Sequence, residues 1–587
     1  MPPSQSVETR PAKRWWVGCI EVALIMLFFF AAAGDAPPAI NEAHYLVKAK
    51  HYWDPTWLAE DLFVASRDAH STFFFVFGWP TLFFDLATAA WLGRAACWGL
   101  VALGLYRCTR FLIPVPLASL LVTAMWMAGV HWANLAGEWV IGGCEAKVPA
   151  YGFLLFGWGE MLRGRRGFGW GLLGCSAAFH VLVGGWGIIA TLFARGLQWR
   201  CASGSSDTKK VIEEMLGGFL GVGLALMGFL PALALAERGN ATDAALAAEI
   251  QVYGRLAHHL QPASFPAMWF LRHGCLVLGF VFLAVHRGTL APQLTVPGNN
   301  TDTTDTANTA ADKSVLGDSG RPLLFFNMII FGSLLIAACG LVVAMLPALD
   351  RQLGAKLLRF YWFRLSDALV PLGLSIAAVQ TLASPAMVPR TARAIAMLAA
   401  CAAIVAVGID FQSRWNEPLI PPAIAVGNQL PKHTVVPENS AARDQQVARD
   451  WMAVCEFIRH ETPEKAIFLT PRHQQSFKWY AHRAEVVNWK DIPQDAPSVV
   501  QWARRINRVF PVSTGRRHPP LEDREIRQLQ RDYGVTYWLV DRRVVGTLPH
   551  STVVYPRQGE VNQTYTLYLL ADEGARPIER GPVDKED

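Results

Sequence analysis

The sequence carries little charge for its length. Only 17% of its 587 residues are Asp, Glu, Lys or Arg, whereas soluble globular domains contain about a quarter. Hydrophobic residues make up 52% of the chain, and the mean hydropathy is +0.24. This composition excludes an ordinary water-soluble fold for the whole chain. In such a protein the net charge of +6 does not indicate nucleic-acid binding, and we expect no nucleic-acid partner.

Familiar cysteine and catalytic motifs are also absent. The ten cysteines include no CxxC pair, and most of them lie inside apolar blocks. We therefore predict that they are small core residues rather than metal ligands or disulfide partners, and we assign no metal ligands. The segment after Phe411 has no phosphate loop and no GxSxG turn.

What the sequence has instead is a series of long apolar blocks. A bilayer core requires about 20 apolar residues per helix, and the blocks predict about eleven such spans. They lie near residues 15–34, 94–106, 111–130, 146–162, a tight pair within 168–195, 213–236, 267–286, 323–347, 366–384 and 391–410. The fold class is thus an α-helical polytopic membrane protein, residues 1–411, followed by a C-terminal extracytoplasmic α/β domain, residues 412–587.

Basic residues set the predicted orientation, because Lys and Arg are retained in cytoplasmic loops. Placing all basic clusters inside puts the N-terminus in the cytoplasm and the C-terminal domain outside. This threading makes residues 35–93 an outer loop, in which 71–91 is a juxtamembrane or re-entrant helix. Residues 288–321 are rich in Asn, Thr, Asp and Ala and are predicted to be a disordered cytoplasmic linker.

The C-terminal segment has the alternating pattern of a small α/β domain. Strands are predicted at residues 466–470, 484–488, 535–540 and 564–570, and helices at 447–460, 498–509 and 521–533. Within it, Arg472, Gln475, Lys478 and Trp479 follow a strand end, where loops often carry function. These side chains suit carbohydrate binding, but the same string also fits a rigid lid packed on the membrane domain.

The loop after the first span is rich in acidic residues. Asp35 and Glu42 follow that span directly, and His44 and Tyr45 come next. A carboxylate there could take a proton from the hydroxyl of a sugar acceptor. The same residues could instead cap helices and solvate the loop, and spacing alone does not separate the two readings.

The run NEAHYL in this loop resembles the acidic signature that opens the first outer loop of GT-C membrane glycosyltransferases, the protein O-mannosyltransferase-like and aminoarabinose-transferase-like enzymes. Residues 92–112, 117–162 and 169–193 resemble their second, third and fourth, and paired fifth and sixth helices. The resemblance in sequence covers about the first two hundred residues. The rest of the chain resembles these enzymes only in its predicted topology. It implies a multi-pass protein of the bacterial cytoplasmic (inner) membrane, with its C-terminal domain periplasmic and a polyprenyl-phosphate sugar donor as partner.

The resemblance also assigns roles to residues. Glu42 corresponds to the catalytic acid of the first loop, Glu145 to the assisting acid of the second loop, and Arg94 to the outer end of the second span. Asn41 stands where the family has aspartate, so Glu42 or Asp35 must substitute. This difference leaves open an altered acceptor, a changed mechanism or loss of transfer activity. A divalent cation at this loop is left open too.

A lipid-phosphate donor requires cations on the outer face, against the positive-inside trend. Arg359 and Arg364 flank Tyr361 and Trp362 on that predicted side, and they are the first phosphate candidates. Alternatively, these residues form a belt of aromatic and basic side chains at the membrane interface. Arg255 and His259 form a second candidate, while His180 is expected to be a polar core residue.

The leading hypothesis is therefore sugar transfer from a polyprenyl-phosphate donor to an extracytoplasmic acceptor. A transporter or flippase of lipid-linked glycans would require internal repeats with acids or helix breaks at mid-membrane depth. The sequence shows no convincing repeat, and its acids lie in loops, which favours the enzyme. A non-catalytic scaffold that keeps the fold is a third hypothesis. The sequence does not indicate the sugar, the acceptor or the oligomeric state.

Overall fold

The computed structural model describes most of the chain. The described residues are 15–200, 208–236, 239–287, 321–384, 388–416, 419–426, 440–510, 521–545 and 552–570. The predicted linker, apart from its last residue Arg321, and the N-terminal basic residues lie outside these ranges.

The chain folds into two compact units. The first consists of residues 1–34, 68–77 and 88–416, and the second of residues 35–67, 78–87 and 417–587. The division differs from the one drawn from the sequence, because residues 35–67 of the acidic loop join the C-terminal segment. We call the two units the helical unit and the sheet unit.

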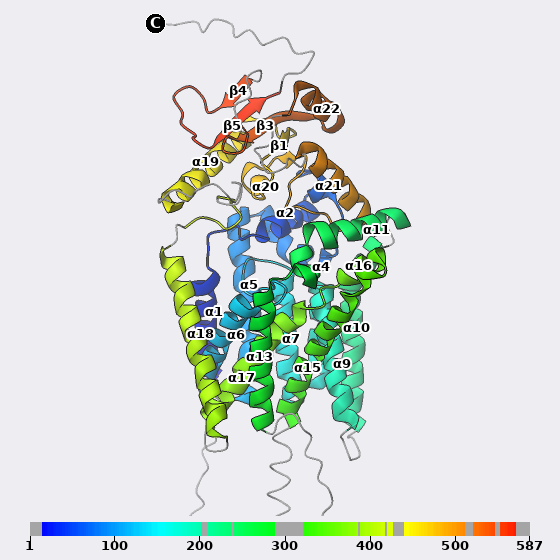
Figure 1. Cartoon of the computed structure of the whole chain (residues 1–587), viewed down its shortest axis with the longest axis vertical. Helices are drawn as coiled ribbons and strands as arrows, with labels where there is room; N and C mark the ends of the chain where they lie inside the picture. Colours follow the sequence, from blue (N-terminus) through cyan, green and yellow to red (C-terminus); the bar gives the residue numbers. More distant parts are fainter. Residues whose placement is uncertain are drawn as a thin grey trace, which may run out of the picture. The chain divides into compact units, whose positions relative to one another are not determined.

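The helical unit is built almost wholly of helices, and the longest run side by side (Figure 1). Its elements are α1 (Trp15–Ala33), α4 (Ser71–Gly78), α5 (Leu86–Leu112), α6 (Ala118–Ala133), α7 (Lys147–Leu162), α8 (Arg166–Phe179), α9 (Val181–Arg200), α10 (Thr208–Ala236), α11 (Ala241–Glu249), the π-helix η2 (Ile250–Arg255), α12 (Ala257–Leu260), η3 (Pro262–Ser264), α13 (Ala267–His286), α15 (Arg321–Val343), η4 (Leu346–Ala348), α16 (Arg351–Leu358), α17 (Arg364–Ala383) and α18 (Arg390–Asn416).

Eight helices among the described residues are long and apolar enough to cross a membrane: α1, α5, α9, α10, α13, α15, α17 and α18. A multi-pass helical membrane protein is the fold class these helices support. The predicted spans 111–130 and 146–162 and the first helix of the 168–195 pair became α6, α7 and α8, of 16, 16 and 14 residues. These are shorter than the about 20 residues of a straight span.

The apolar segment 71–91 is not one continuous helix. Helix α4 ends at Gly78, a 3₁₀ turn (η1, Trp79–Leu82) follows, and α5 starts at Leu86. Pro80 lies in the first turn of η1, where its missing N–H costs nothing. The second predicted span therefore begins earlier than residue 94 and is 27 residues long.

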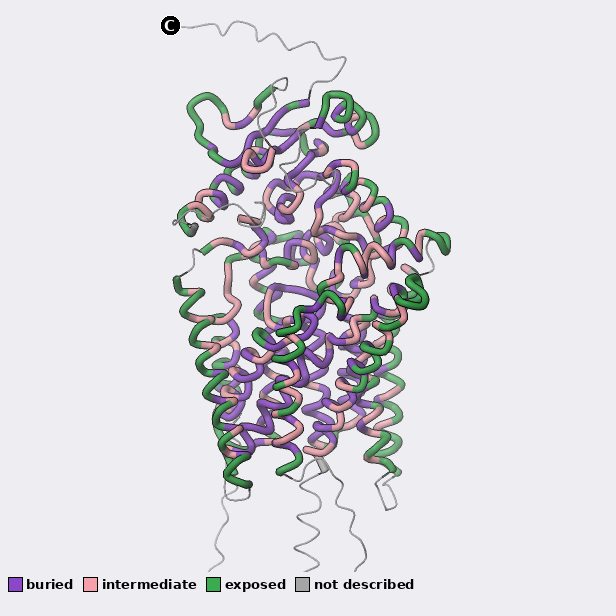
Figure 2. The backbone as a smooth tube through the Cα atoms, viewed as in Figure 1, coloured by how far each residue is buried: buried purple, intermediate pink, exposed green. Residues whose placement is uncertain are grey.

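Burial separates the central helix of this unit from its peripheral ones. In the most apolar window of α17, 94% of residues are buried, against 11% in α10 and 17% in α18. Exposed residues accordingly follow α10 and α18 in Figure 2. Such apolar outer faces suit contact with lipid. The described cysteines are free, but Cys19, Cys275, Cys339 and Cys401 are exposed, so the prediction of core positions was wrong for these four.

Small residues let α8 and α10 approach closely. A Cβ on Gly174 would lie 2.2 Å from the backbone oxygen of Gly221, and one on Gly217 would lie 2.1 Å from that of Gly167. Packing of this kind is common between membrane helices, where dispersion contacts replace the hydrophobic effect.

The sheet unit contains a five-stranded sheet in the order β2-β1-β3-β5-β4. Strand β1 (Ile467–Leu469) pairs in parallel with β2 (Ala484–Glu485) and β3 (Val535–Asp541), and β5 (Tyr565–Leu569) pairs antiparallel with β3 and with β4 (Thr552–Tyr555). The helices are α2 (Glu42–Trp53), α3 (Leu62–Ala65), α19 (Ser440–Glu461), α20 (Phe477–Ala481), α21 (Ala496–Val509) and α22 (Asp523–Tyr533).

The predicted α/β pattern agrees with this unit at every strand and helix it named. It missed β4 and α20, which are short, and it missed that residues 35–67 belong here. The core includes Trp451 of α19, Phe468 of β1, Phe477 of α20 and Tyr565 of β5. A backbone hydrogen bond from Ala423 to Pro38 oxygen (3.1 Å) ties the two distant chain segments together.

Candidate functional site

Two clusters of buried charged side chains stand out, one in each unit. The Arg364 cluster, in the helical unit, consists of Glu138, Glu145, Lys147, His180 and Arg364. The Lys478 cluster, in the sheet unit, consists of His44, Asp61, Lys478, Glu485 and Asp491. Buried charges are costly unless they are paired, so each cluster calls for an explanation.

The loop between α6 and α7 supplies both acids of the Arg364 cluster, and Asp367 of α17 holds it. The Asp367 carboxylate accepts hydrogen bonds from the backbone N–H of Leu135 (2.7 Å) and of Ala136 (2.8 Å). The next residue, Gly137, has a φ of +69°, which glycine adopts without strain. The chain therefore turns directly after this anchor and presents Glu138.

Arg364 is the first residue of α17 and lies at the centre of its cluster. Its Nε donates to Oε2 of Glu138 (2.9 Å), and its Nη1 lies 3.1 Å from Nε2 of His180. The guanidinium carbon sits 3.9 Å from the centroid of the Tyr361 ring. Three groups from separate parts of the sequence thus fix the position of one cation.

Lys147, the first residue of α7, is the second cation. Its Nζ lies 3.4 Å from Oε1 of Glu138 and 3.8 Å from Oε2 of Glu145. It also lies 3.4 Å from the centroid of the Trp139 ring, a cation–π contact that strengthens when water is excluded. The Lys147 side chain is only 6% exposed, so the acids and the ring replace its hydration.

Histidines border the cluster. The His180 ring, between α8 and α9, lies 5.0 Å from the His70 ring. His259 in α12 makes a hydrogen bond through Nδ1 with the backbone oxygen of Ala136 (2.6 Å). Burial lowers the pKa of His259 to about 3, although this hydrogen bond opposes the shift. His259 is therefore neutral at physiological pH and braces the acidic loop.

The other cations expected at a phosphate site have different surroundings. Arg359 follows the last residue of α16 and is half-buried, and it forms no ion pair with a described residue. Arg255 is buried at the end of the π-helix η2. Arg94 is fully buried in α5, with its guanidinium 4.6 Å from the centroid of the Trp91 ring. Of the predicted residues, the structure brings Arg364 and Glu145 into one cluster.

Sequence reasoning missed Glu138 and Lys147. It expected His180 to be a polar core residue, and His180 is indeed buried, with its Nε2 beside Arg364. One signal was available for Lys147. It lies in a loop that the charge pattern puts outside the cytoplasm, so it opposes the positive-inside trend in the same way as Arg364. Glu138 had no comparable signal, because its partners lie far away in the sequence.

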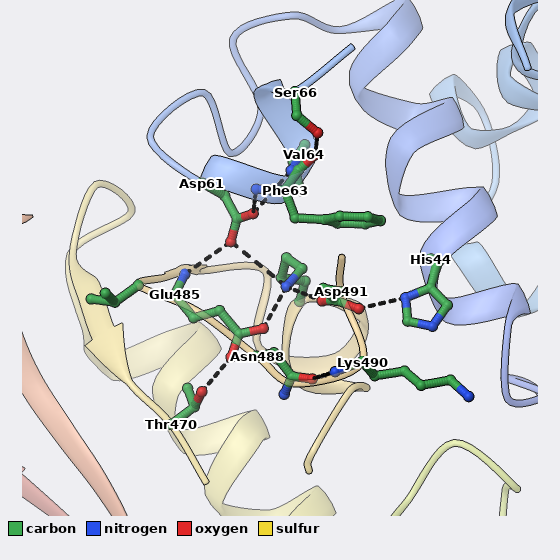
Figure 3. A network of polar contacts seen from close by, with 12 residues as sticks. His44, Asp61, Phe63, Val64, Ser66, Thr470, Glu485, Asn488, Lys490 and Asp491 are labelled. Atoms are coloured by element: carbon green, nitrogen blue, oxygen red, sulfur yellow. Dashed lines mark hydrogen bonds and ion pairs between the residues drawn. The ribbon is translucent and has the colours of Figure 1, made fainter. Parts of the chain in front are cut away.

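The Lys478 cluster lies within the sheet unit (Figure 3). Lys478 of α20 forms ion pairs with Asp491 (2.5 Å), with Glu485 of β2 and with Asp61 (3.7 Å). Asp61 also caps α3, and its second oxygen accepts the backbone N–H of Glu485 (3.1 Å). His44 of α2 pairs through Nδ1 with Asp491 (2.5 Å). These contacts join residues 35–67 to the C-terminal segment.

The acids of this cluster differ in the direction in which their pKa values are shifted. Burial raises the pKa of Glu485 to about 7; the attraction of Lys478 opposes the rise, and Asp491 and Asp61 add to it. Burial also acts on Asp491, but Lys478 and His44 outweigh it and hold the pKa of Asp491 below its usual range. Burial would lower the pKa of Lys478, yet the three acids raise it well above its ordinary value. Lys478 and Asp491 are therefore ionised, while Glu485 titrates near neutrality.

The acids expected to act as the catalytic base also lie in the sheet unit. Glu42 is fully buried at the first position of α2, where its Oε2 accepts the backbone N–H of Ala39 (2.9 Å). Asn41 occupies the N-cap position, but its side chain makes no capping hydrogen bond to the helix backbone. The Glu42 side chain instead reaches back three residues to the backbone that precedes the helix. Asp35 and Tyr45 are partly buried.

The string expected to bind carbohydrate is mostly internal. Gln475, Lys478 and Trp479 are all buried. Arg472 is partly buried, with its guanidinium 4.6 Å from the centroid of the Trp489 ring. Gln475, Lys478 and Trp479 are thus packed inside the sheet unit and do not line an open surface. Within the described ranges, no group of three or more His, Cys, Asp or Glu side chains could hold a metal ion.

Comparison with known proteins adds one similarity. The profile of a family described as a domain of unknown function, DUF6798, matches residues 449–509. That stretch runs from α19 through β1, α20 and β2 to the end of α21, and it contains Lys478, Glu485 and Asp491 of the Lys478 cluster. No curated protein matches the chain.

Proposed function

We propose that this chain is a membrane glycosyltransferase that transfers a sugar from a polyprenyl-phosphate donor to an acceptor hydroxyl. The observation that carries the proposal is the Arg364 cluster, two buried cations and two carboxylates at helix ends of a membrane protein. Ionisable groups in such surroundings are rare and usually functional. The resemblance of the first two hundred residues to GT-C enzymes points to the same reaction.

The chemistry of the donor fits the cations of this cluster. A donor of this class has an apolar chain that dissolves in the bilayer and a phosphate that does not. Arg364 offers a planar fork of N–H groups that matches phosphate oxygens, and Lys147 adds a point charge. When the sugar leaves, negative charge builds up on this phosphate, and the two cations stabilise it.

The two carboxylates of the cluster provide the second requirement. An acceptor hydroxyl becomes a good nucleophile only when a base removes its proton as it attacks the sugar. The resemblance assigns that role to Glu42 or Asp35, with Glu145 assisting. Glu138 and Glu145 share a unit with both cations, so our proposal assigns the reaction to the Arg364 cluster.

The test is a transfer assay on the full-length protein in lipid nanodiscs, with a synthetic polyprenyl-phosphate sugar and a panel of sugar acceptors. Removal of the Arg364 fork in Arg364→Gln should lower the rate by about 10²-fold or more. Lys356→Gln is the control, because Lys356 is exposed on α16 and should leave the rate unchanged. Transfer that is equally fast in both variants contradicts the proposal. Donor translocation without transfer supports a flippase instead.

A further inference from the structure

The Arg364 cluster is electrically balanced by its own residues. Arg364 and Lys147 contribute two positive charges, and Glu138 and Glu145 contribute two negative ones. Glu138 contacts both cations, at 2.9 Å from Arg364 Nε and 3.4 Å from Lys147 Nζ. Its side chain is only 6% exposed, so water does not screen these contacts well.

Such a balance conflicts with the binding of another anion. A donor phosphate needs the N–H groups that Glu138 already engages, and its charge would add a third negative group to a buried site. An uncompensated buried charge is strongly unfavourable. The phosphate and the Glu138 carboxylate therefore compete for the same cations.

Glu145 is placed differently. Its carboxylate lies 3.8 Å from Lys147, beyond ordinary hydrogen-bond distance. The Glu138 carboxylate, in contrast, accepts a hydrogen bond directly from Arg364 Nε at 2.9 Å. Displacement by phosphate should therefore affect Glu138 much more than Glu145.

From this competition we infer that Glu138 is an exchangeable carboxylate: the donor phosphate displaces it from Arg364, and the released carboxylate serves as the base for the acceptor. This inference rests on the proposed function and goes further by naming the base and the event that frees it. In the protein without donor, the Glu138 carboxylate is paired with Arg364. Only donor binding makes it available, so acceptor activation follows donor binding.

The reaction step balances as follows. The acceptor oxygen forms a bond to the anomeric carbon, and the bond between that carbon and the phosphate oxygen breaks. The bonding pair stays on the departing phosphate, whose charge is neutralised by Arg364 and Lys147. The acceptor proton moves to Glu138, which becomes neutral. Loss of that proton to solvent and departure of the polyprenyl phosphate return Glu138 to Arg364.

The experiment measures the binding of polyprenyl phosphate, the product left by transfer, to full-length protein in nanodiscs without acceptor. Glu138→Gln removes the competing charge and keeps the shape, so it should lower the Kd about tenfold relative to wild type. Glu145→Gln is the matched control and should change the Kd little. In single-turnover assays with bound donor, Glu138→Gln should slow transfer by about 10²-fold or more. Tighter binding together with slower transfer is the signature of an exchangeable base.

The outcomes separate this inference from the proposed function. A wild type that binds no polyprenyl phosphate contradicts both. A wild type that binds it, with Glu138→Gln binding equally or more weakly, contradicts the exchange alone. Glu138→Asp is a second variant that keeps the inference testable if Glu138→Gln misfolds. Its shorter side chain keeps the negative charge but reaches Arg364 less well. It should bind polyprenyl phosphate with a Kd between those of wild type and Glu138→Gln, and a Kd above that of wild type contradicts the exchange.

Discussion

The guanidinium of Arg364 donates to the carboxylate of Glu138 over 2.9 Å, although 226 residues separate them in the sequence. Their meeting depends on α17, which starts with Arg364 and one turn later presents Asp367 to the backbone of the Glu138 loop. A single helix thus anchors the loop and pairs with its acid. Such rigid support is what positions a binding site to within a fraction of an ångström.

Asp367→Asn tests this support. The amide of asparagine has one acceptor oxygen, so one of the two backbone N–H groups loses its partner. Leaving such a buried group unsatisfied costs about 1–3 kcal/mol. We expect a lower melting temperature and a raised KM for the donor, because the loop that carries Glu138 loosens. Ser375→Ala on the same helix is the control, since the Ser375 hydroxyl donates to the backbone oxygen of Pro371 within α17. An equal change in KM in both variants would point to a general effect on α17.

Arg364→Lys tests whether the fork, rather than the charge, matters. Lysine keeps the charge but cannot reach Glu138 and His180 in the planar geometry of arginine. The donor KM should rise several-fold, and most of the transfer rate should be lost. Arg359→Lys on the neighbouring turn should behave like wild type in the same assay. Full activity of Arg364→Lys would show that a point charge is sufficient.

Lys478→Met tests the cluster in the sheet unit. The variant leaves three buried acids without their shared cation, which should destabilise this unit by about 3–5 kcal/mol. Hydrogen exchange measured by mass spectrometry on the full-length protein should report faster exchange in α2, α20 and β2. Lys465→Met is the matched control, because Lys465 is exposed in the same unit. Unchanged exchange in Lys478→Met would mean that the cluster does not hold residues 35–67 to the C-terminal segment.

The pH dependence of the sheet unit follows from Glu485. Its pKa of about 7 in the folded protein lies above the ordinary value of 4.5, so the folded state binds a proton that the unfolded state has already released. Stability from this group is present below pH 4.5 and is lost as the pH rises to about 7. Burial lowers the pKa of His44 and gives the opposite trend up to pH 6.5, so wild type must be compared with Glu485→Gln. Wild type should lose stability relative to Glu485→Gln between pH 4.5 and 7, measured by urea unfolding; a constant difference would contradict the raised pKa.

The sequence predicted those parts of the fold that depend on local patterns. The apolar block 267–286 became α13 at Ala267–His286, because length and hydropathy determine such a helix almost alone. The strand ending at Leu469 and the helix ending at Val509 were likewise visible in short periodic runs. Helices α6, α7 and α8 were harder, since they are only 14 to 16 residues long.

The candidate site could not be predicted in the same way. Arg364 was singled out because a cation on the predicted outer face opposes the positive-inside trend. Its partner Glu138 had no local pattern to mark it, and the pairing of Asp61 with Lys478 likewise depends on how distant segments pack. Glu42 starts α2, but its burial follows from tertiary structure that spacing does not reveal.

The most direct test of the central claim is an experimental structure of the full-length protein with polyprenyl phosphate bound. The account predicts phosphate oxygens at about 2.7–2.9 Å from the Arg364 guanidinium, with the Glu138 carboxylate no longer in contact with that guanidinium. A phosphate bound elsewhere, with the Arg364 to Glu138 pair intact, would contradict it.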